Sequence, residues 1–534
     1  MTDTIYDIFV ESSDKSPEKA FLCIPNEKPG ASKDISYAEV REQVAACRQL
    51  YKDAGFGHGH RVALLLGARA DFVVHYLALN GLGCTIVPVN PDYRHPELLY
   101  LVSHSESDIA VVLPDRVADL EAVGKELGRP FPVIDIDQFS AGIPGAVRPA
   151  PESGAPGSAT IAAILYTSGT TGQPKGCLLS NECHLICGAW YRDHGGVLTM
   201  EHGTERFYNP SPFYHVNNLS VGLTCVILTR NCLIMVERFS PSRWWPEIIS
   251  SQATIVHYLG IIPSMLMKLP PAPHDRGHTV KFGFGAGIEP QLHGPFEERF
   301  GFPLVEIWGM TETPRVFAAN FEPRQIDTRA FGRPMNGYEA KIVDDNGQEV
   351  PRGEMGELLV RTAGSDPRHG FFSGYLKNEE ATEDSWRDGW FHTGDICTQA
   401  DDDMLYFVDR KKNIVRRGGE NISAVEVEAA VLTHPAVAQV AVIAVPDDLR
   451  EEEVMACIVL NGDVEVTPSL PNEIFAWCDE RIAYYKTPGW MIFLDSLPLT
   501  PSQRLQRTRI FDPGTDPRVQ PGVIDLRDQK KRNK

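Results

Sequence analysis

The sequence lacks the long apolar runs and the paired cysteines that mark two large classes of protein. Its longest apolar stretches, VGLTCVILTR and AVAQVAVIAVP, are interrupted well before the roughly 18 apolar residues that a membrane-spanning helix needs. The start, MTDTIYDIFVESSDK, carries acids where a secretion signal has a basic segment and an apolar run. The 11 cysteines are scattered without a C-x-x-C pair, which favours a reducing compartment. We therefore expect a cytoplasmic protein that does not span a membrane.

Basic residues are scarce relative to acidic ones. The chain has 51 Lys and Arg against 71 Asp and Glu, a formal net charge of −20. Nucleic acids and anionic membranes need clustered Lys and Arg, so neither is expected as a partner, and any anionic ligand must be held by a local site. The densest group of metal-binding residue types, Cys183, His184 and Cys187, has no second ligand pair nearby, and we assign it to packing. Homodimer formation is left open.

The chain is long enough for several packed units. Its 534 residues predict two to four of them. In the first part, strand patterns at residues 59–66, TIVPVN and DIAVVLP alternate with the helical patterns ADFVVHYLALNGLG and HPELLYLVSHS. This alternation is typical of α/β layering around a largely parallel sheet. A segment rich in Pro, Gly and Ser at 141–158 is expected to be a surface linker.

The pattern changes twice further along the chain. Strand-like segments with turns at DNG and RGE indicate a β-rich subdomain, and after about residue 410 two helical and three strand patterns indicate a small α+β domain. We predict an α/β fold with a large, multilayered N-terminal domain over 1–409, made of α/β subdomains and the β-rich subdomain. A small, mobile C-terminal domain over 410–511 and a flexible tail over 512–534 complete the prediction.

The most informative segment is YTSGTTGQPKG at 166–176. It holds three Gly, four Ser or Thr hydroxyls and Lys175 directly after a predicted strand. Backbone N–H groups and hydroxyls in such a loop can surround phosphate oxygens, with Lys175 as a mobile point charge. No G-K-[ST] follows the glycines, so this is not a Walker A loop, and the segment is not a dinucleotide fingerprint either. Composition alone leaves a polar surface turn as an equal alternative.

TSGTTGQPKG resembles the signature loop of the acyl-adenylate-forming superfamily, which includes acyl-CoA synthetases, nonribosomal peptide adenylation domains and luciferases. Further motifs of that superfamily follow in order: FYHVNNLSVG (213–222), FGAGIEP (284–290), IWGMTET (307–313), GWFHTGD (389–395), DRKKNIVRRGGENIS (409–423) and LPLTPSQRLQR (497–507). The resemblance covers nearly the whole chain. It implies an AMP-forming ligase that activates a carboxylic acid with ATP and Mg²⁺ and transfers the acyl group to CoA.

The resemblance also implies where ATP and Mg²⁺ bind. The loop over the β and γ phosphates would comprise Thr167, Ser168, Gly169, Thr170, Thr171, Gly172 and Lys175. Glu312, directly after Thr311, would hold Mg²⁺, a hard cation that suits carboxylate and phosphate oxygens. Asp395 would accept hydrogen bonds from the ribose hydroxyls, and Arg410 would add a ribose or phosphate contact. The adenine would lie between small residues and an aromatic face, formed by Gly285, Ala286, Gly287, Trp308 and Gly309.

The acyl group would lie beside His215, which corresponds to the gate of the acyl pocket in the superfamily. The other pocket candidates are Val216, Asn217, Asn218, Tyr258, Leu259, Gly260, Gly285 and Met310. Two adjacent Asn are unusual in a wall that meets only an alkyl chain, so we expect a small or polar acid. VHYLGIIPSML and IWGMTET most resemble the crotonobetaine/carnitine–CoA ligase branch, whose cationic substrate would favour aromatic faces such as Tyr258 or Trp308. Medium-chain and aromatic acids stay open.

The resemblance assigns the C-terminal motifs to thioester formation with CoA, and one of these motifs departs from the superfamily pattern. Lys412 matches the hinge position, and Gly418, Gly419 and Glu420 match the segment that meets the pantetheine arm of CoA. The superfamily usually ends in T-x-x-G-K, whereas TPSQRLQR places Gln503 and Arg504 there. Because Arg is a planar fork rather than a compact ammonium, we expect Arg504 to support adenylation less efficiently. Alternatives are delivery to a separate carrier protein, a mainly thioester-forming enzyme, and a binding protein without catalysis.

Overall fold

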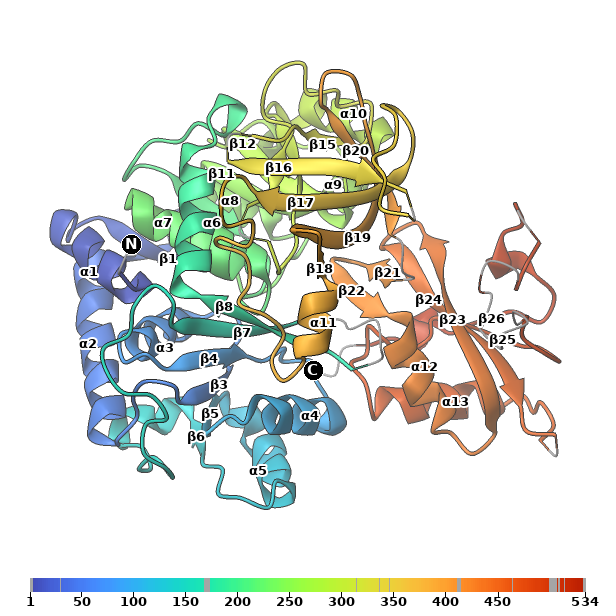
Figure 1. Cartoon of the computed structure of the whole chain (residues 1–534), viewed down its shortest axis with the longest axis horizontal. Helices are drawn as coiled ribbons and strands as arrows, with labels where there is room; N and C mark the ends of the chain where they lie inside the picture. Colours follow the sequence, from blue (N-terminus) through green and yellow to red (C-terminus); the bar gives the residue numbers. More distant parts are fainter. Residues whose placement is uncertain are drawn as a thin grey trace. The chain divides into compact units, whose positions relative to one another are not determined.

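The computed structural model describes residues 3–28, 30–167, 173–313, 315–335, 337–344, 346–410, 414–462, 464–498, 507, 510–512 and 514–531. The chain divides into two compact units (Figure 1). The larger unit comprises residues 1–91, 102–166 and 176–409, and the smaller one comprises 92–101, 167–175 and 410–534. The main chain thus passes from one unit to the other at Arg410, while two short earlier segments group with the smaller unit.

The first sheet of the larger unit has the strand order β6-β5-β3-β4-β7-β8. Its pairs β3–β4, β3–β5, β4–β7 and β5–β6 are parallel, with Ala63 opposite Val87 on one side and Ala110 on the other. The strands are β3 (Arg61–Leu65), β4 (Thr85–Pro88), β5 (Ile109–Val112), β6 (Val133–Asp135), β7 (Ile161–Thr167) and β8 (Lys175–Ser180). The helices that follow β3, β4 and β5 in the chain are α3 (Ala70–Asn80), α4 (His95–Ser105) and α5 (Val117–Glu126), and the first part of α4, up to Leu101, groups with the smaller unit. The predicted alternation of strands and helices is confirmed.

The second sheet carries most of the candidate site. Its order is β14-β13-β12-β11-β9-β10-β1-β2, and the pairs from β13 through β1 are parallel. The strands are β1 (Ala20–Ile24), β2 (Lys33–Ser36), β9 (Arg206–Asn209), β10 (Cys232–Met235), β11 (Ile255–Leu259), β12 (Phe282–Ala286), β13 (Leu304–Trp308) and β14 (Phe317–Ala318). The helices of this region are α1 (Ile5–Lys15), α2 (Tyr37–Asp53), α6 (Asn181–Asp193), α7 (Leu223–Thr229), α8 (Trp244–Ser251), α9 (Ile261–Lys268) and α10 (Pro290–Phe300).

The third sheet is the predicted β-rich region. It runs in the order β15-β20-β19-β17-β16, with β18 paired to β19, and the pairs β15–β20, β16–β17 and β17–β19 are antiparallel (Figure 1). Its elements are β15 (Ala330–Gly332), β16 (Tyr338–Val343), β17 (Gly356–Thr362), α11 (Glu379–Asp384), β18 (Trp386–Arg387), β19 (Trp390–Gln399) and β20 (Leu405–Arg410). Buried and less buried residues alternate along β19, as expected for an antiparallel strand with one face toward the core.

The smaller unit contains the predicted C-terminal α+β fold. Strands β22-β21-β24-β25-β26 form its sheet, and β23 pairs with β24. The elements are β21 (Ile414–Arg417), β22 (Glu420–Ser423), α12 (Ala424–Leu432), β23 (Val437–Asp447), β24 (Glu451–Leu460), α13 (Leu470–Asp479), β25 (Trp490–Phe493) and β26 (Ile524–Asp525). Residues of α12, α13 and the strands share one apolar core with Leu526, which is 2% exposed.

The flexible tail predicted after residue 512 differs from the structure. In the described part of this segment, β26 pairs antiparallel with β25, and the N–H of Leu526 donates to the carbonyl of Gly489 at 2.8 Å. The Pro-rich and then basic composition of this segment suggested fraying, although Val523, Ile524 and Leu526 are apolar. The burial of Leu526 in the core of the smaller unit becomes visible only in the structure.

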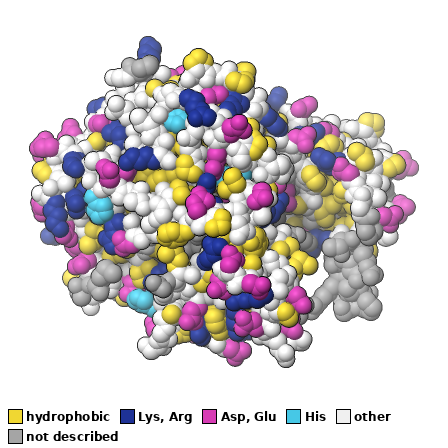
Figure 2. Space-filling view, turned by 90° about the horizontal axis from the view of Figure 1, so that it is seen from above, with side chains coloured by type: hydrophobic (Ala, Val, Ile, Leu, Met, Phe, Trp, Pro, Cys, Tyr) yellow, Lys and Arg dark blue, Asp and Glu magenta, His cyan; other side chains and the backbone are white. Residues whose placement is uncertain are grey.

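Local signals explain several element boundaries. The α2 helix begins with a capping box in which Ser36 and Glu39 satisfy each other's backbone N–H groups. Thr4 and Asp7 do the same for α1. None of the helices in the described ranges is both long and apolar enough to cross a membrane. All eleven cysteines, each in a described range, are buried free thiols. Acidic and basic side chains are interspersed on the face shown in Figure 2.

Candidate active site

The phosphate-binding motif connects two neighbouring strands of the first sheet. Thr167 ends β7, and Lys175 begins β8. Ser168, Gly169, Thr170, Thr171 and Gly172 lie outside the described residues. The carbonyl of Pro174 accepts a hydrogen bond from the Tyr100 hydroxyl at 2.8 Å, which holds one end of the loop. A Gly- and Thr-rich connection directly after a buried strand is the context in which backbone N–H groups bind phosphate.

Asp395 and Trp308 come together from two different sheets. The indole N–H of Trp308, the last residue of β13, donates to Asp395 Oδ2 on β19 at 2.8 Å. The backbone N–H of Asp395 also donates to the Thr393 hydroxyl at 3.1 Å. Both Asp395 and Trp308 are buried, at 1% and 6% exposure. The tryptophan therefore orients the carboxylate that the sequence assigned to the ribose.

Trp308 also belongs to an aromatic cluster. Phe317 stacks on it with ring centroids 5.6 Å apart, and Phe331 lies at 6.1 Å. The sequence did not predict this core contact or the bond to Asp395, because the partners come from distant segments. Stacking of adenine on Trp308 stays a prediction.

Glu312 lies at the start of a turn after β13. Its Oε1 accepts a hydrogen bond from the Tyr375 hydroxyl at 2.8 Å, and its backbone carbonyl accepts from the N–H of Phe372 at 3.0 Å. The hydroxyl of Thr313 bonds back to the backbone of Met310, which closes the turn. In the described ranges no three His, Cys, Asp or Glu side chains gather into a metal site. A single carboxylate fits Mg²⁺ that takes its other ligands from phosphate oxygens and water.

The structure adds Glu306 to the candidate residues. This carboxylate on β13 accepts a hydrogen bond from the Tyr258 hydroxyl at 3.1 Å and bonds to the backbone N–H of Gly287. Burial of the carboxyl raises the pKa of Glu306 to about 7. Tyr258 lies opposite Gly285 in the β11–β12 ladder, and Gly285 lies opposite Glu306 in the β12–β13 ladder. Three residues assigned to the pocket or to adenine, Tyr258, Gly285 and Gly287, therefore lie next to an acid that the sequence analysis did not single out. An acidic residue within an otherwise apolar strand, LVEIW, was the signal that could have found it.

A polar network lies where the acyl pocket is predicted. Asn217 begins a π-helical turn, η4 (Asn217–Gly222), and its Oδ1 lies 3.0 Å from Asn209 Nδ2 and 2.8 Å from His257 Nδ1. The Tyr191 hydroxyl lies 3.3 Å from the other ring nitrogen of His257. Burial lowers the pKa of His257 to about 3, so the imidazole is neutral. Asn209 Nδ2 also lies 3.0 Å from His257 Nδ1. We assign His257 Nδ1–H and Asn209 Nδ2 as donors to Asn217 Oδ1, so the contact between Asn209 and His257 joins two donors and is not a hydrogen bond.

The two adjacent asparagines have different surroundings. Among described residues, Asn217 Nδ2 has no hydrogen-bond partner, and this atom is not fully buried. Asn218 is buried, and its amide donates to the carbonyl of Ser211 at 2.6 Å. Asn217 therefore offers a donor, while Asn218 secures the segment that leads into the turn. π-helical turns are frequent at functional sites.

The remaining predicted residues occupy ordinary positions. Gly260 precedes α9, Ala286 ends β12, and Gly309 and Met310 follow β13. Tyr258 directly follows His257 in the chain, and the half-buried His215 lies two residues before Asn217. The gating role of His215 stays a prediction.

The C-terminal motifs belong to the smaller unit. Arg410 ends β20, while Lys412 and Arg504 lie outside the described residues. Gly418 and Gly419 form the turn of the β21–β22 hairpin, with Arg417 opposite Glu420. Their φ angles are +56° and +88°, a pair of left-handed residues that only glycine adopts readily in a two-residue turn. Arg507 forms an ion pair with Glu428 at 2.6 Å.

The chain thus combines a Gly- and Thr-rich loop after a buried strand, a buried carboxylate at the position expected to bind ribose, and a smaller unit with its own core. The model of the AMP-binding enzyme family matches residues 9–376, and that of the AMP-binding enzyme C-terminal domain matches 426–504. The chain belongs to the AMP-binding enzyme family. It is an acid–thiol ligase of the adenylate-forming superfamily.

Two ligases illustrate the similarity in sequence. The crotonobetaine/carnitine–CoA ligase of Proteus mirabilis is 29% identical over 489 residues, which cover 88% of this chain and 91% of the relative. The sulfoacetate–CoA ligase of Cupriavidus necator is 27% identical over 526 residues, which cover 96% and 98%. The alignment therefore extends over both units.

Solved structures show the same fold. The o-succinylbenzoate CoA synthetase of Bacillus subtilis, bound with a product analogue, superposes with a TM-score of 0.83 at 24% identity, covering 96% of this chain and 98% of that one. The amide bond synthetase of Marinactinospora thermotolerans gives 0.79 at 24% identity, with coverages of 95% and 99%. The predicted fold class is confirmed.

Proposed function

We propose that this ligase activates a small carboxylic acid that carries a second hydrogen-bond acceptor, such as another carboxylate or a sulfonate, and transfers the acyl group to CoA. In the first step the acid's carboxylate attacks the α-phosphorus of ATP and pyrophosphate leaves. In the second step the thiol of CoA attacks the acyl carbonyl, loses its proton and displaces AMP. Glu312 would hold Mg²⁺, and Asp395 would bind the ribose.

The observation that carries the substrate class is the orientation of Asn217. Its amide oxygen is occupied by Asn209 and His257, so the group left for a ligand is a donor. His257 is neutral and adds no charge. A donor in a partly enclosed site favours a substrate that carries an acceptor, because a hydrogen-bonding group that is buried without a partner costs free energy. The relative that acts on sulfoacetate is consistent with this class.

A quaternary ammonium substrate fits these residues less well. Tyr258 and Trp308, the aromatic residues considered for it, are 2% and 6% exposed, and their polar atoms bind Glu306 and Asp395. A cation–π site needs an accessible aromatic face. The similarity to a crotonobetaine/carnitine–CoA ligase therefore does not by itself assign that acid to this chain.

The test is pyrophosphate release from ATP and Mg²⁺ with sulfoacetate, malonate, crotonobetaine, octanoate and benzoate, each with and without CoA. We expect the fastest release with the two acids that carry a second acceptor, slower but measurable release with benzoate, and acyl-CoA as the product. Preference for crotonobetaine or octanoate would contradict the substrate class. Adenylate formation that never yields acyl-CoA would favour transfer to a carrier protein.

Asn217→Asp provides the matched variant. Asp keeps the oxygen that accepts from Asn209 and His257 but replaces the free donor with a negative charge. We expect kcat/KM for an anionic acid to fall by roughly tenfold or more, the value of a hydrogen bond to a charged group. Benzoate, which offers no second acceptor, should be affected less. An equal loss for both acids would contradict the assigned contact.

A further inference from the structure

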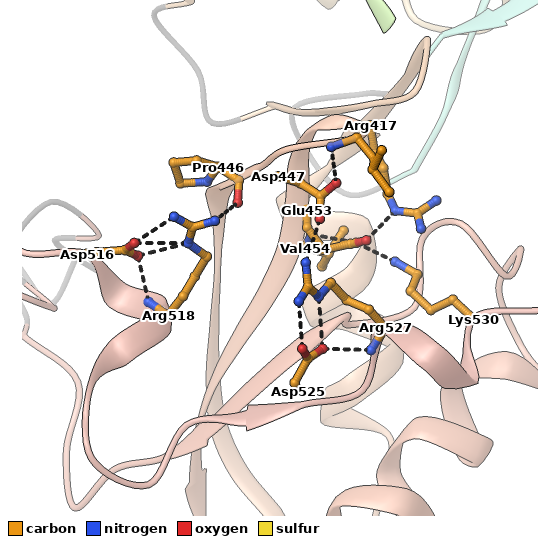
Figure 3. A network of polar contacts seen from close by, with 11 residues as sticks. Arg417, Pro446, Asp447, Glu453, Val454, Asp516, Arg518, Asp525, Arg527 and Lys530 are labelled. Atoms are coloured by element: carbon orange, nitrogen blue, oxygen red, sulfur yellow. Dashed lines mark hydrogen bonds and ion pairs between the residues drawn. The ribbon is translucent and has the colours of Figure 1, made fainter. Parts of the chain in front are cut away.

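The last described residues of the chain form a buried ionic contact with the sheet of the smaller unit. Lys530 Nζ lies 2.5 Å from Glu453 Oε1, and Arg417 Nε lies 2.7 Å from Glu453 Oε2 (Figure 3). All three side chains are at most 4% exposed. One carboxylate on β24 therefore contacts both Lys530 and the last residue of β21.

Several further contacts hold the C-terminal segment in place. Arg527 forms ion pairs with Asp525 at 2.7 Å and with Asp447 at 3.0 Å (Figure 3). Its guanidinium lies over the Trp490 ring, 4.4 Å from the ring centroid. The Gln529 side chain donates to Asn472 Oδ1 at 2.6 Å. The segment is thus attached on both sides of Leu526, whose side chain is buried in the core.

Gly489 leaves room for the Glu453 carboxylate because it carries no side chain. A Cβ on Gly489, directly before β25, would lie 2.6 Å from the Glu453 carboxyl carbon. Glu453 Oε1 also accepts a hydrogen bond from the backbone N–H of Val454 at 2.9 Å. The carboxylate is therefore confined to a single position, and its two cationic partners are confined with it.

Arg417 connects this buried cluster to the glycine turn. It is the last residue of β21, and Gly418 and Gly419 follow it directly. The N–H of Gly418 donates to the carbonyl of Arg450 at 3.0 Å. Among described residues, Arg417 Nη2 is enclosed without a hydrogen-bond partner, so the bond to Glu453 is the ionic contact that orients its guanidinium. Because the turn contains two glycines, its conformation depends on the residues that flank it.

We propose that Lys530 is a positioning residue for the thiol-transfer step: through Glu453 and Arg417, the C-terminal segment 524–531 holds the Gly418–Gly419 turn in the conformation that receives CoA. The proposal rests on the proposed function, transfer of the acyl group to CoA, and on the expectation from the superfamily motif that this turn meets the pantetheine arm. Lys530 itself does not touch a substrate. We expect its effect to be confined to the second half-reaction, because the turn is assigned to CoA and not to ATP or the acid.

The test uses Lys530→Met in the full chain, with Lys531→Met as the matched control. Methionine has a similar length, and Glu453 stays neutralised by Arg417, so no unpaired charge is buried. Lys531 is the exposed neighbour of Lys530. Three quantities are compared: acid-dependent ATP–pyrophosphate exchange without CoA, the KM for CoA in acyl-CoA formation, and hydrogen–deuterium exchange of the peptide spanning 414–423.

We expect Lys530→Met to leave ATP–pyrophosphate exchange unchanged, to raise the KM for CoA about fivefold or more, and to accelerate deuterium uptake around Gly418. Lys531→Met should change none of these. Normal deuterium uptake would overturn the proposal, and so would faster uptake with an unchanged KM. If the native chain forms no acyl-CoA with any acid, the proposed function fails. Hydrogen–deuterium exchange of the two variants still tests whether Lys530 holds the Gly418–Gly419 turn.

A second variant covers the case in which Lys530→Met does not fold. Gln529→Ala removes the bond to Asn472 and so loosens the same segment without touching a charge. It should change the KM for CoA and deuterium uptake in the same direction by a smaller factor. No change in either quantity with a folded Gln529→Ala protein would overturn the proposal.

Discussion

The indole N–H of Trp308 donates a hydrogen bond to Asp395 Oδ2 at 2.8 Å, and the two residues are 87 positions apart in the chain. The bond joins β13 of a parallel sheet to β19 of an antiparallel one. It orients the carboxylate that we assign to the ribose, so we expect nucleotide binding to depend on Trp308, a residue of the aromatic core.

Trp308→Phe tests this dependence. The change removes the donor and leaves a buried carboxylate oxygen without that partner, which costs about 1–3 kcal/mol. We expect a lower melting temperature and a higher KM for ATP, with a smaller change in the KM for the acid. Trp386→Phe is the control, since Trp386 is a buried tryptophan of the same unit with no contact to Asp395. Equal effects of both changes on the KM for ATP would contradict the assigned role.

Glu312→Gln tests the proposed Mg²⁺ ligand. Glutamine can still accept the hydrogen bond from Tyr375 but lacks the charge that binds a hard cation. We expect the rate of pyrophosphate release to fall roughly a hundredfold and the Mg²⁺ concentration for half-maximal rate to rise. Glu380→Gln, which alters an exposed carboxylate on α11, should have no effect. An unchanged Mg²⁺ titration would show that the metal is held elsewhere.

Glu306 predicts a pH dependence of stability. Its pKa in the folded protein is raised to about 7, so between pH 4.5 and 7 the folded state holds more protons than the unfolded state. Stability must therefore fall as the pH rises through this window. We expect the melting temperature of the native protein, relative to that of Glu306→Gln, to decrease from pH 5 to pH 8. Glu298→Gln, which alters an exposed carboxylate on α10, should keep the native profile.

Arg504→Lys tests the departure from the superfamily motif. A compact ammonium should bridge the acid and the α-phosphate better than a planar guanidinium, so we expect acid-dependent pyrophosphate release to increase. Arg507→Lys serves as the control, because Arg507 in the same motif is bound to Glu428. An unchanged or lower rate for Arg504→Lys would mean that arginine is no handicap in this enzyme.

Much of the architecture could be predicted from short segments. The strands β3, β4 and β5 and the helices α3 and α4 follow the predicted alternation because apolar runs and helical periodicity are local properties. The segment after residue 512 was predicted incorrectly, since local composition does not reveal that Leu526 enters a core or that Lys530 meets Glu453. Buried charges become interpretable only when their partners are known.

The sequence by itself determined the fold class, the superfamily and the residue types of the site, because signature motifs such as YTSGTTGQPKG and IWGMTET are contiguous. The tertiary structure decided which side chains meet. Trp308 reaches Asp395, Glu306 lies between Tyr258 and Gly287, and His257 orients Asn217. These contacts depend on the order and register of strands that are distant in the chain. The pKa values of Glu306 and His257 follow from the burial that this packing creates.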